Sequence, residues 1–394
     1  MTKVYNRNWL FGKINLIAVL GALLVAGSAS AQLSGTYTIN SGAATSGSNY
    51  ASFTALSTAL QASGVSGAVT INVVAASGPY SEQFYLDEIT GSSATNTITI
   101  NGNGEEIRAN SPIIELEGTD FITFDDLVIK QTGSVDDKMF LAYDDVESVT
   151  IQNCELIASS GEAYGSYPGY YTSAYIWFGN NAFYYSAVSD ETKDINIENN
   201  KLWKGNSSVN GIGKNFGIYV ANASSYTSDQ NIEISGNDIQ DIGQYGIYTY
   251  YASGWDIDGN IIHNDNNTNS TQCYGIYVYD YFFSGASAVN INANKIYNLA
   301  KNRSYLYVQL MGIYAYGYYA GVDFNITNNV IDLEGPYYMY GIYAYAYQAS
   351  GDHNIVNNTI RMAGNVTYAY TNHYGIYNYY APSGDVKNNI IVDQ

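Results

Sequence analysis

Two short sequence units alternate along the second half of the chain, and neither is long enough to form a helix. The first unit is an aromatic residue or Met followed by Gly-Ile-Tyr, and the second is aliphatic-x-x-Asn-x-aliphatic. The glycine of the first unit recurs at intervals of 29, 29, 37, 29 and 34 residues, at Gly217, Gly246, Gly275, Gly312, Gly341 and Gly375. The asparagine of the second unit is Asn200, Asn237, Asn260, Asn294, Asn329, Asn358 or Asn389.

Polar and hydrophobic residues alternate within these units, as in Asn290-Ile291-Asn292 and Asn325-Ile326-Thr327. A period of two predicts strands of about four to six residues. Short strands in units of roughly 30 residues, joined by Gly/Ser/Asn-rich loops, predict a parallel β-solenoid whose successive turns stack about 4.8 Å apart. A propeller would need a longer period of about 40 to 45 residues, and the Leu-x-x-Leu-x-Leu motif of leucine-rich repeats is absent.

The segments Ile326–Ile331 (ITNNVI) and Ile355–Ile360 (IVNNTI) resemble the right-handed parallel β-helix repeats of the pectin-lyase-like superfamily. The leading segment is similar too, because Tyr50–Leu60 (YASFTALSTAL) resembles the short helix that seals the first coil. The resemblance extends from Gln32 to the end and implies an all-β fold, a right-handed parallel β-helix with a short N-terminal capping helix and long loops. It does not identify a function, since such helices carry lyases, hydrolases, adhesins and tail spikes alike.

We expect three segments: a signal peptide at residues 1–31, the N-terminal cap and first coils at 32–110, and repeats at 111–394. Basic residues, the apolar run Ile14–Ala26 and Ala29-Ser30-Ala31 are typical of a cleaved secretory signal, which predicts an extracellular or bacterial cell-surface location and no transmembrane segment in the mature chain. The end of the chain soon after Asn389, without a capping segment, predicts truncation at the C-terminus. In the less regular first half we expect strands at 97–101, 112–116, 121–130 and 148–152, and we interpret 158–189 as a loop that leaves the solenoid.

Stacking in register converts each repeat position into a column along the axis. The isoleucines of the first unit share a face with small or aliphatic residues and should fill the lumen: Ile218, Ile247, Ile276, Ile313, Ile342 and Ile376. The tyrosines should then point outward in two columns. The first column is Tyr219, Tyr248, Tyr277, Tyr314, Tyr343 and Tyr377, and the second is Tyr250, Tyr279, Tyr316, Tyr345 and Tyr379, with Ala221 as the exception.

These tyrosine columns allow two interpretations. Stacked aromatic rows stabilise parallel sheets, so their role can be structural alone. Rigid tyrosines also combine an apolar ring with a hydroxyl group and present a long platform suited to a polymer, which makes the tyrosines from Tyr248 to Tyr379 candidate ligand-binding residues for a polysaccharide or cell-surface glycan.

The asparagine row predicts a structural ladder in which each side chain bonds the asparagines above and below it. Cys154 lies at the ladder position of its own segment, and Cys273 lies about four coils further on. This spacing exceeds disulfide reach, so we expect two buried free thiols.

Charge and composition exclude several functions. The formal charge is −20, and −23 without the signal segment, which argues against nucleic acid as a partner. The mature chain has only Arg108, Arg303 and Arg361 as arginines, at unrelated repeat positions, so a basic cleft for a uronate polymer is not expected. His263, His353 and His373 fall at different offsets, so we expect separate surface roles for them.

Carboxylates are abundant but scattered, including the pairs 125–126, 136–137 and 144–145. Asp256 and Asp258 flank Ile257 and should lie on one outer strand face about 7 Å apart, which suits a calcium site or the carboxylate pair of an inverting glycosidase. A solvated acidic strand explains them equally well. They are weak catalytic candidates, and beyond this calcium option no cofactor or metal is expected.

We therefore expect a secreted or cell-surface β-helix repeat protein that acts as a binding or adhesion module, for carbohydrate, through exposed tyrosine columns. Two alternatives stay open: a polysaccharide lyase or glycoside hydrolase of the pectin-lyase-like type, and a structural spacer without ligand. The sequence assigns no catalytic centre.

Overall fold

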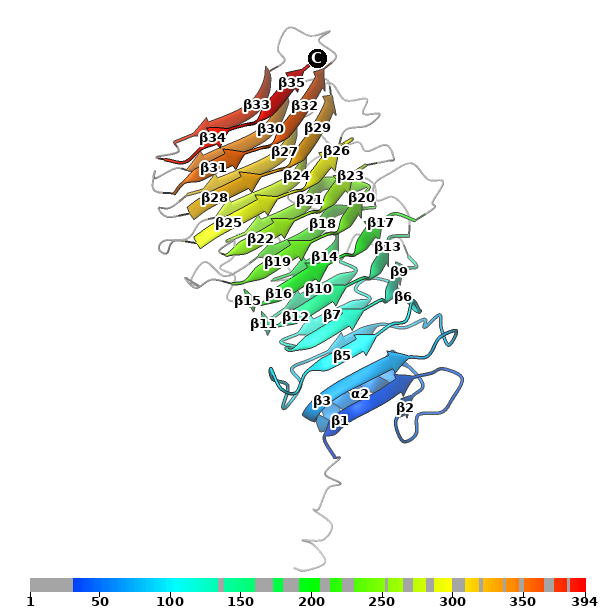
Figure 1. The fold of residues 1–394 in the computed structure, drawn as a ribbon. Coiled ribbons are helices and arrows are strands. Elements are labelled where there is room, and N and C mark those ends of the chain that lie inside the picture. Colours follow the sequence, from blue (N-terminus) through cyan, green and yellow to red (C-terminus); the bar gives the residue numbers. More distant parts are fainter. Residues whose placement is uncertain are drawn as a thin grey trace, which may run out of the picture.

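The described part of the chain is an elongated stack of short strands with one helix near its N-terminal end (Figure 1). A computed structural model describes residues 31–133, 138–159, 173–179, 191–205, 213–221, 230–251, 254–264, 272–280, 287–299, 309–318, 322–335, 338–346, 351–364, 372–380 and 383–394. Residues 1–30, and with them nearly all of the expected signal peptide, lie outside these ranges.

Three parallel sheets run along the stack, and we call them sheets A, B and C. Within the described residues sheet A contains 13 strands, in spatial order β2 (Asn49–Tyr50), β1 (Leu33–Ile39), β3 (Val65–Val73), β5 (Ile98–Asn101), β8 (Ile122–Asp125), β12 (Val149–Gln152), β16 (Ile195–Glu198), β19 (Ile232–Ser235), β22 (Trp255–Asp258), β25 (Ser287–Asn292), β28 (Val322–Thr327), β31 (His353–Val356) and β34 (Val386–Lys387).

Sheet B contains, in the same direction, β6 (Glu106–Ala109), β9 (Val128–Gln131), β13 (Glu155–Ile157), β17 (Lys201–Trp203), β20 (Asp238–Gln240), β23 (Ile261–His263), β26 (Lys295–Tyr297), β29 (Val330–Gly335), β32 (Thr359–Gly364) and β35 (Ile390–Asp393). Sheet C contains β4 (Phe84–Leu86), β7 (Ile114–Glu117), β10 (Phe140–Tyr143), β14 (Ala174–Phe178), β18 (Lys214–Ala221), β21 (Ile242–Tyr250), β24 (Gln272–Asp280), β27 (Gln309–Gly317), β30 (Tyr338–Ala346) and β33 (Asn372–Tyr379). A small parallel pair joins β11 (Val146–Glu147) to β15 (Thr192–Lys193).

From β5 onward the chain passes through sheets A, B and C in that order, and the strands of one turn pair in parallel with the equivalent strands of the next, as β19, β20 and β21 do with β22, β23 and β24. This arrangement confirms the predicted all-β fold, a parallel β-helix. The N-terminal turns are covered by helix α2 (Phe53–Ser63), which begins three residues later than expected because Ser52 caps it: the Ser52 hydroxyl accepts a hydrogen bond of 3.0 Å from the Ala55 N–H.

The predicted isoleucine column is confirmed. Ile247, Ile276 and Ile313 are directly opposite one another on β21, β24 and β27, and each is fully buried in the lumen. Burying one such side chain stabilises the fold by roughly 1.5 to 3 kcal/mol, so the column is a main source of stability.

The glycine of each Gly-Ile-Tyr unit lies where sheet C passes close to sheet B. A Cβ atom on Gly275 would lie 2.6 Å from both the Gly312 carbonyl oxygen and Cγ2 of Ile296, so no side chain fits there. At the glycine, the alternation between side chains that face the lumen and side chains that face outward shifts by one residue. Leu310 and Ile313 both belong to the lumen, whereas Met311 and Tyr314 belong to or pack against a separate aromatic cluster outside it.

The asparagine row forms the corner between sheets A and B. Asn237 illustrates the pattern: its Nδ2 donates to the Asn260 Oδ1 at 2.9 Å and to the Ile197 carbonyl oxygen at 2.8 Å. The same side-chain bond links each successive pair of the row, from Asn200 to Asn389, at 2.9 to 3.1 Å. The ladder thereby satisfies buried backbone groups where the chain bends.

Two expectations from the first half are wrong. The segment 121–130 is not one strand, because the chain turns at Asp126, whose φ is 51°, and divides it into β8 in sheet A and β9 in sheet B. The segment 158–189, interpreted as a loop, contains β14, which pairs with β10 and β18. All five residues of β14 are buried, so it lacks the alternation that identifies a half-exposed strand.

Candidate functional site

The outer surface of sheet C is the most distinctive face of the molecule. The first tyrosine column lies in register on β18, β21, β24, β27, β30 and β33, and the second column lies two residues further along the same strands from β21 onward. We call the outward side chains of these strands the tyrosine face. Their cluster is separate from the cluster that fills the lumen.

The rings of each column are stacked on one another. In the first column successive ring centroids are 4.6 to 5.2 Å apart and the ring planes are within 14° of parallel. In the second column the distances are 4.8 to 5.4 Å. Parallel rings at such distances overlap in offset stacks, the arrangement that aromatic pairs prefer.

This stacking changes how the face can contact a ligand. Because both faces of an inner ring, such as that of Tyr277, lie against the neighbouring tyrosines, those ring faces are not available to a sugar. The edge of the ring and the hydroxyl group are what a half-buried tyrosine offers to a ligand. The expected flat aromatic platform is therefore a row of ring edges and hydroxyl groups.

Burial varies between the columns. In the first column Tyr219 and Tyr248 are only 6% and 9% exposed, whereas Tyr277 and the members that follow it are half-buried. The second column is half-buried from Tyr250 to Tyr345, and Tyr379 is 41% exposed. The second column is thus the more accessible of the two.

Burial also changes the acidity of the phenols. It raises the pKa of Tyr274 to about 12 and, reinforced by neighbouring tyrosines, raises the pKa values of Tyr248, Tyr277 and Tyr314 above their usual range. These hydroxyl groups remain protonated at physiological pH and keep their ability to donate hydrogen bonds.

A third column was not predicted as part of this face. It consists of the aromatic or Met residue that opens each unit: Phe216, Tyr245, Tyr274, Met311, Tyr340 and Tyr374. Its rings meet those of the first column edge to face, as Tyr245 does with Tyr248 at 4.9 Å and 78°. The sequence shows the recurring aromatic position but not its direction. Because the alternation of inward and outward side chains shifts at the glycine, simple alternation does not predict that this position faces outward.

Toward the N-terminus the positions of the first column are occupied by residues of several types, one of them charged. The Trp177 ring stacks on Tyr219 with centroids 3.6 Å apart, and Leu141, Glu115 and Tyr85 precede it in register. Here the Glu117 carboxylate accepts hydrogen bonds from the hydroxyl groups of Tyr85, at 2.6 Å, and Tyr143, at 3.1 Å. The charged groups are thus confined to this end, and the columns of the tyrosine face contain no charged residue from β21 onward.

The candidate carboxylates Asp256 and Asp258 lie on the outer face of sheet A, whereas the tyrosine face belongs to sheet C. Both are exposed, and they accept hydrogen bonds from Asn290 and Asn292 at 2.6 and 2.5 Å. Glu233, which was not singled out from the sequence, is directly opposite Asp256 on the preceding turn. The three carboxylates line one shallow depression on this sheet.

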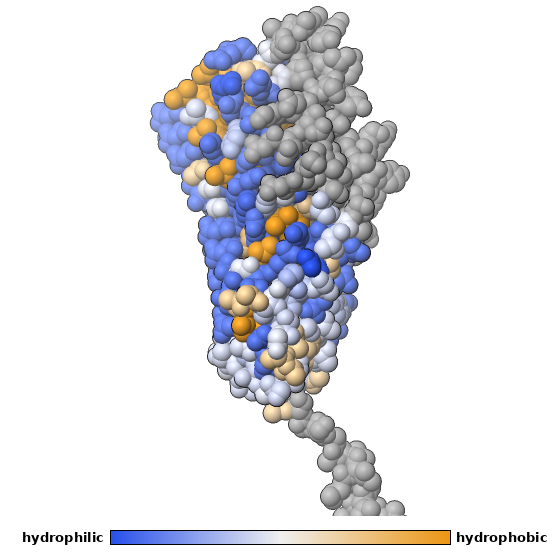
Figure 2. Space-filling model, turned by 90° about the vertical axis from the view of Figure 1, so that its right-hand side faces the viewer, coloured by the Kyte–Doolittle hydropathy of each residue, from blue (hydrophilic) through white to orange (hydrophobic). Residues whose placement is uncertain are grey.

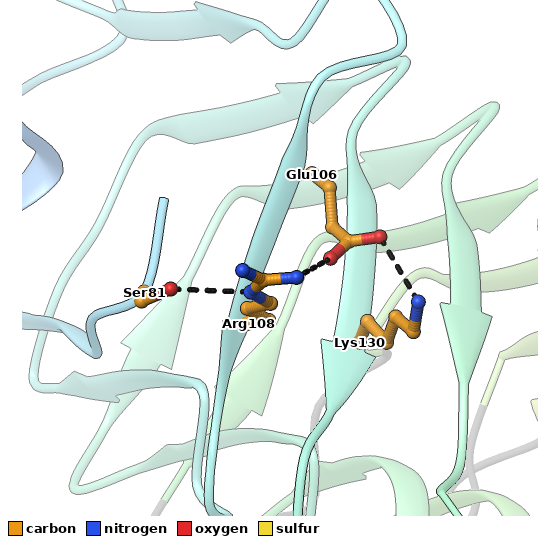
Figure 3. Close-up of polar contacts among 4 residues, drawn as sticks. All are labelled: Ser81, Glu106, Arg108 and Lys130. Atoms are coloured by element: carbon orange, nitrogen blue, oxygen red, sulfur yellow. Dashed lines mark hydrogen bonds and ion pairs between the residues drawn. The ribbon is translucent and has the colours of Figure 1, made fainter. Parts of the chain in front are cut away.

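Three basic residues of sheet B contact acidic side chains. Arg108 and Lys130 are neighbours on β6 and β9, and both contact the Glu106 carboxylate, at 3.4 and 3.3 Å (Figure 3). Arg108 also donates to the Ser81 hydroxyl at 3.1 Å. Arg361 is paired with Asp332 at 3.1 Å, and Arg303 lies outside the described residues.

The histidines lie on different sheets and do not converge, as expected, but His263 and His353 are buried rather than on the surface. His353 is fully buried, its Nδ1 lies 2.7 Å from the Asn378 Oδ1, and burial lowers its pKa. His263 is also buried, with its ring stacked on Tyr297 and its Nε2 3.1 Å from Asp238. They lie on different sheets, so they form no joint centre.

The two cysteines are buried free thiols, as predicted. Burial raises the pKa of Cys154 to about 12, so this thiol is not a nucleophile at neutral pH. Among the described residues no group of three or more His, Cys, Asp and Glu side chains is arranged to hold a metal ion. The carboxylate pairs at 125–126 and 144–145 therefore join no such group, and Asp136 and Asp137 lie outside the described residues.

Figure 2 shows a side of the solenoid on which hydrophilic residues predominate and hydrophobic ones form small separate patches. In the described part of the chain, no helix has the length and apolar character that crossing a membrane requires.

No family model and no curated protein matches the sequence. Among solved structures the chain is similar to PfbA, a surface adhesin of Streptococcus pneumoniae, with 11% identity, a TM-score of 0.37, and coverage of 74% of this chain and 77% of that one. This similarity is too low to bear on function. By its own three parallel sheets, the protein is a parallel β-helix, and its outer surface on sheet C is rich in tyrosine.

Proposed function

We propose that the protein acts outside the cell or on its surface as a binding or adhesion module, and that its tyrosine face binds carbohydrate. The observation that carries this proposal is the continuity of the face: three in-register columns extend over β21, β24, β27, β30 and β33 without a charged residue among them. A long, regular and uncharged surface suits a polymer that lies along the axis.

The mode of contact follows from the stacking. The second column presents half-buried ring edges and hydroxyl groups at the spacing of the strands, about 4.8 Å. Hydroxyl groups donate and accept hydrogen bonds, as sugars do, and the ring edges exclude water around those bonds. Recognition would therefore depend on hydroxyl groups of the second column rather than on the ring faces of the first.

A variant that removes only hydroxyl groups tests whether the second column binds glycan through them. Tyr279→Phe/Tyr316→Phe/Tyr345→Phe keeps the stack, and the loss of three hydrogen bonds of about 0.5 to 1.5 kcal/mol each would weaken glycan binding by at least about tenfold. The measurement is binding of the mature chain to a glycan array and to soluble polysaccharides. The matched control is Tyr37→Phe/Tyr50→Phe/Tyr297→Phe, which removes three hydroxyl groups on β1, β2 and β26, outside these columns. Equal binding by the triple variant and the wild type would exclude the proposed contact, and absence of binding by the wild type would favour a spacer.

A second candidate function is polysaccharide cleavage, favoured by the depression that Glu233, Asp256 and Asp258 line on sheet A. A glycoside hydrolase needs two carboxyl groups on either side of the scissile bond. Release of reducing ends from a polysaccharide panel, and its loss in Asp256→Asn and Asp258→Asn, would support a hydrolase. Unsaturated ends that require added calcium would instead indicate a lyase.

A further inference from the structure

The first tyrosine column has properties that ligand binding does not explain. Its N-terminal members are almost completely buried, and the faces of its rings are turned to one another rather than outward. The column is nevertheless unbroken: from Trp177 to Tyr377 every ring stacks on the next, first at 3.6 Å and then at 4.6 to 5.2 Å between centroids.

Tryptophan and tyrosine are the side chains most readily oxidised by one electron, apart from the sulfur-containing ones. Electron transfer between two such groups becomes much slower as their separation grows, so stacked rings exchange electrons far more readily than rings scattered through a protein. We propose that Trp177 and the first column form a relay that carries oxidising equivalents along the axis to the more exposed tyrosines of the second column.

The two ends of the column differ in a way that gives the relay a direction. The Lys138 ammonium group lies 5.0 Å from the centre of the Trp177 ring, and a nearby positive charge disfavours a second one on that ring. A tyrosine that loses an electron must also release its phenolic proton, which is easiest where the hydroxyl group reaches solvent. Tyr345 is half-buried and Tyr379 is 41% exposed. The tyrosyl radical therefore accumulates in the second column.

The two columns are connected at several turns. The rings of Tyr314 and Tyr316 are 6.2 Å apart and parallel within 2°, and the pairs 343–345 and 377–379 repeat this contact at 6.3 and 6.0 Å. A charge that reaches the middle of the first column can therefore pass to the second.

The chemistry balances at each step. A one-electron oxidant outside the chain takes one electron from Trp177. The resulting Trp177 radical cation takes an electron from Tyr219, which releases its phenolic proton and becomes a neutral tyrosyl radical. At every later step the electron passes from a tyrosine to the neighbouring tyrosyl radical, which takes up a proton while the donor releases its own. The net result is one reduced oxidant, one proton in solvent and one tyrosyl radical at an accessible position, and two such radicals on different molecules combine into a dityrosine bond.

The test uses a tethered photo-oxidant. Because both native thiols are buried, a cysteine introduced by Glu115→Cys can be labelled selectively with a ruthenium polypyridyl complex. Glu115 lies two strands before Trp177 in the same column. Flash oxidation with a sacrificial quencher, a nitroxide trap for tyrosyl radicals, and mass spectrometry of the peptides then show which tyrosines became oxidised.

Two triple variants test the relay: the first interrupts it, and the second is the control. Tyr274→Phe/Tyr277→Phe/Tyr279→Phe interrupts all three columns on β24 while keeping aromatic rings there. Tyr37→Phe/Tyr50→Phe/Tyr297→Phe removes the same number of hydroxyl groups outside the columns. Circular dichroism and unfolding midpoints verify that both variants fold.

The relay predicts trapped radicals on β27, β30 and β33 in the wild type and in the control, and their loss from these strands in the β24 variant, with those on β21 retained. Equal adduct yields beyond β24 in the β24 variant would overturn the proposal, since oxidation would then spread through solvent. Wild-type adducts confined to Trp177 and Tyr219 would overturn it too, because the column would not conduct. Neither result depends on whether the face binds glycan.

Discussion

Oδ1 of Asn260 accepts two hydrogen bonds from Asn237, one from the backbone N–H at 3.0 Å and one from Nδ2 at 2.9 Å. Both asparagines are fully buried. One side-chain oxygen thus satisfies two donors of the preceding turn, which explains why the ladder position accepts asparagine at turn after turn.

Replacing Asn260 should therefore be costly. In Asn260→Ala the two donors of Asn237 lose their acceptor, and the Ile234 carbonyl loses the bond of 2.8 Å that it accepts from Asn260. An unsatisfied buried polar group costs about 1 to 3 kcal/mol, so we expect a loss of roughly 3 kcal/mol or more in the free energy of unfolding, measured by urea denaturation. Asn101→Ala, on the half-exposed outer face, is the control and should cost less than about 1 kcal/mol. Similar costs for both would contradict a structural ladder.

The repeated glycine gives a second stability prediction. Gly275→Ala places a Cβ atom 2.6 Å from the Gly312 carbonyl oxygen and from Ile296, and overpacking of this kind costs about 1 to 3 kcal/mol. Gly317→Ala is the matched control, because the nearest atom to its Cβ would be 3.5 Å away and Ala346 already occupies the equivalent position of the next turn. If both variants melted at the wild-type temperature, sheets B and C would not approach at Gly275 as described.

The buried phenols make the fold sensitive to alkali. Their pKa values are raised in the folded protein, so the folded state holds protons that the unfolded chain releases above its ordinary tyrosine pKa of about 10. Stability should be independent of these groups below about pH 10 and should fall as the pH rises toward the folded value, which is about 12 for Tyr274.

Denaturant unfolding at a series of alkaline pH values measures this dependence. Tyr274→Phe/Tyr277→Phe/Tyr314→Phe removes three of the raised groups and should flatten the decline. A variant that lost stability as steeply as the wild type above pH 10 would mean that these hydroxyl groups are not buried.

Thiol accessibility tests the packing of the lumen. Cys154 and Cys273 are 2% and 0% exposed, so both should be inert to a thiol reagent in the native protein and should react only at the rate of local or global opening. Denaturant should release two thiols per chain. Immediate reaction of either thiol without denaturant would contradict its position in the core.

The sequence allowed the architecture and the interior columns to be predicted because Ile247, Ile276 and Ile313 recur in a unit with an unambiguous glycine and tyrosine. It did not reveal β14, since Trp177 and its neighbours are buried on both faces and show no alternation. Nor did it indicate that Glu233 lies beside Asp256, because the turns differ in length and only the register fixes that pairing. The stacking of rings such as those of Tyr277 and Tyr314 depends on side-chain conformation, which repeat spacing does not determine.

The register of the tyrosine columns is best tested by paired cysteines on β24, β27 and β30. Tyr279 and Tyr316 are directly opposite one another on adjacent turns, and Tyr345 is one turn further. Adjacent strands are about 4.8 Å apart, within disulfide reach, whereas two turns separate Cα atoms by about 9.6 Å, beyond the limit of about 7 Å. Mild oxidation should therefore form an intramolecular disulfide in Tyr279→Cys/Tyr316→Cys and not in Tyr279→Cys/Tyr345→Cys. The reverse result, or no disulfide in either variant, would contradict the coil-upon-coil register from which the tyrosine face arises.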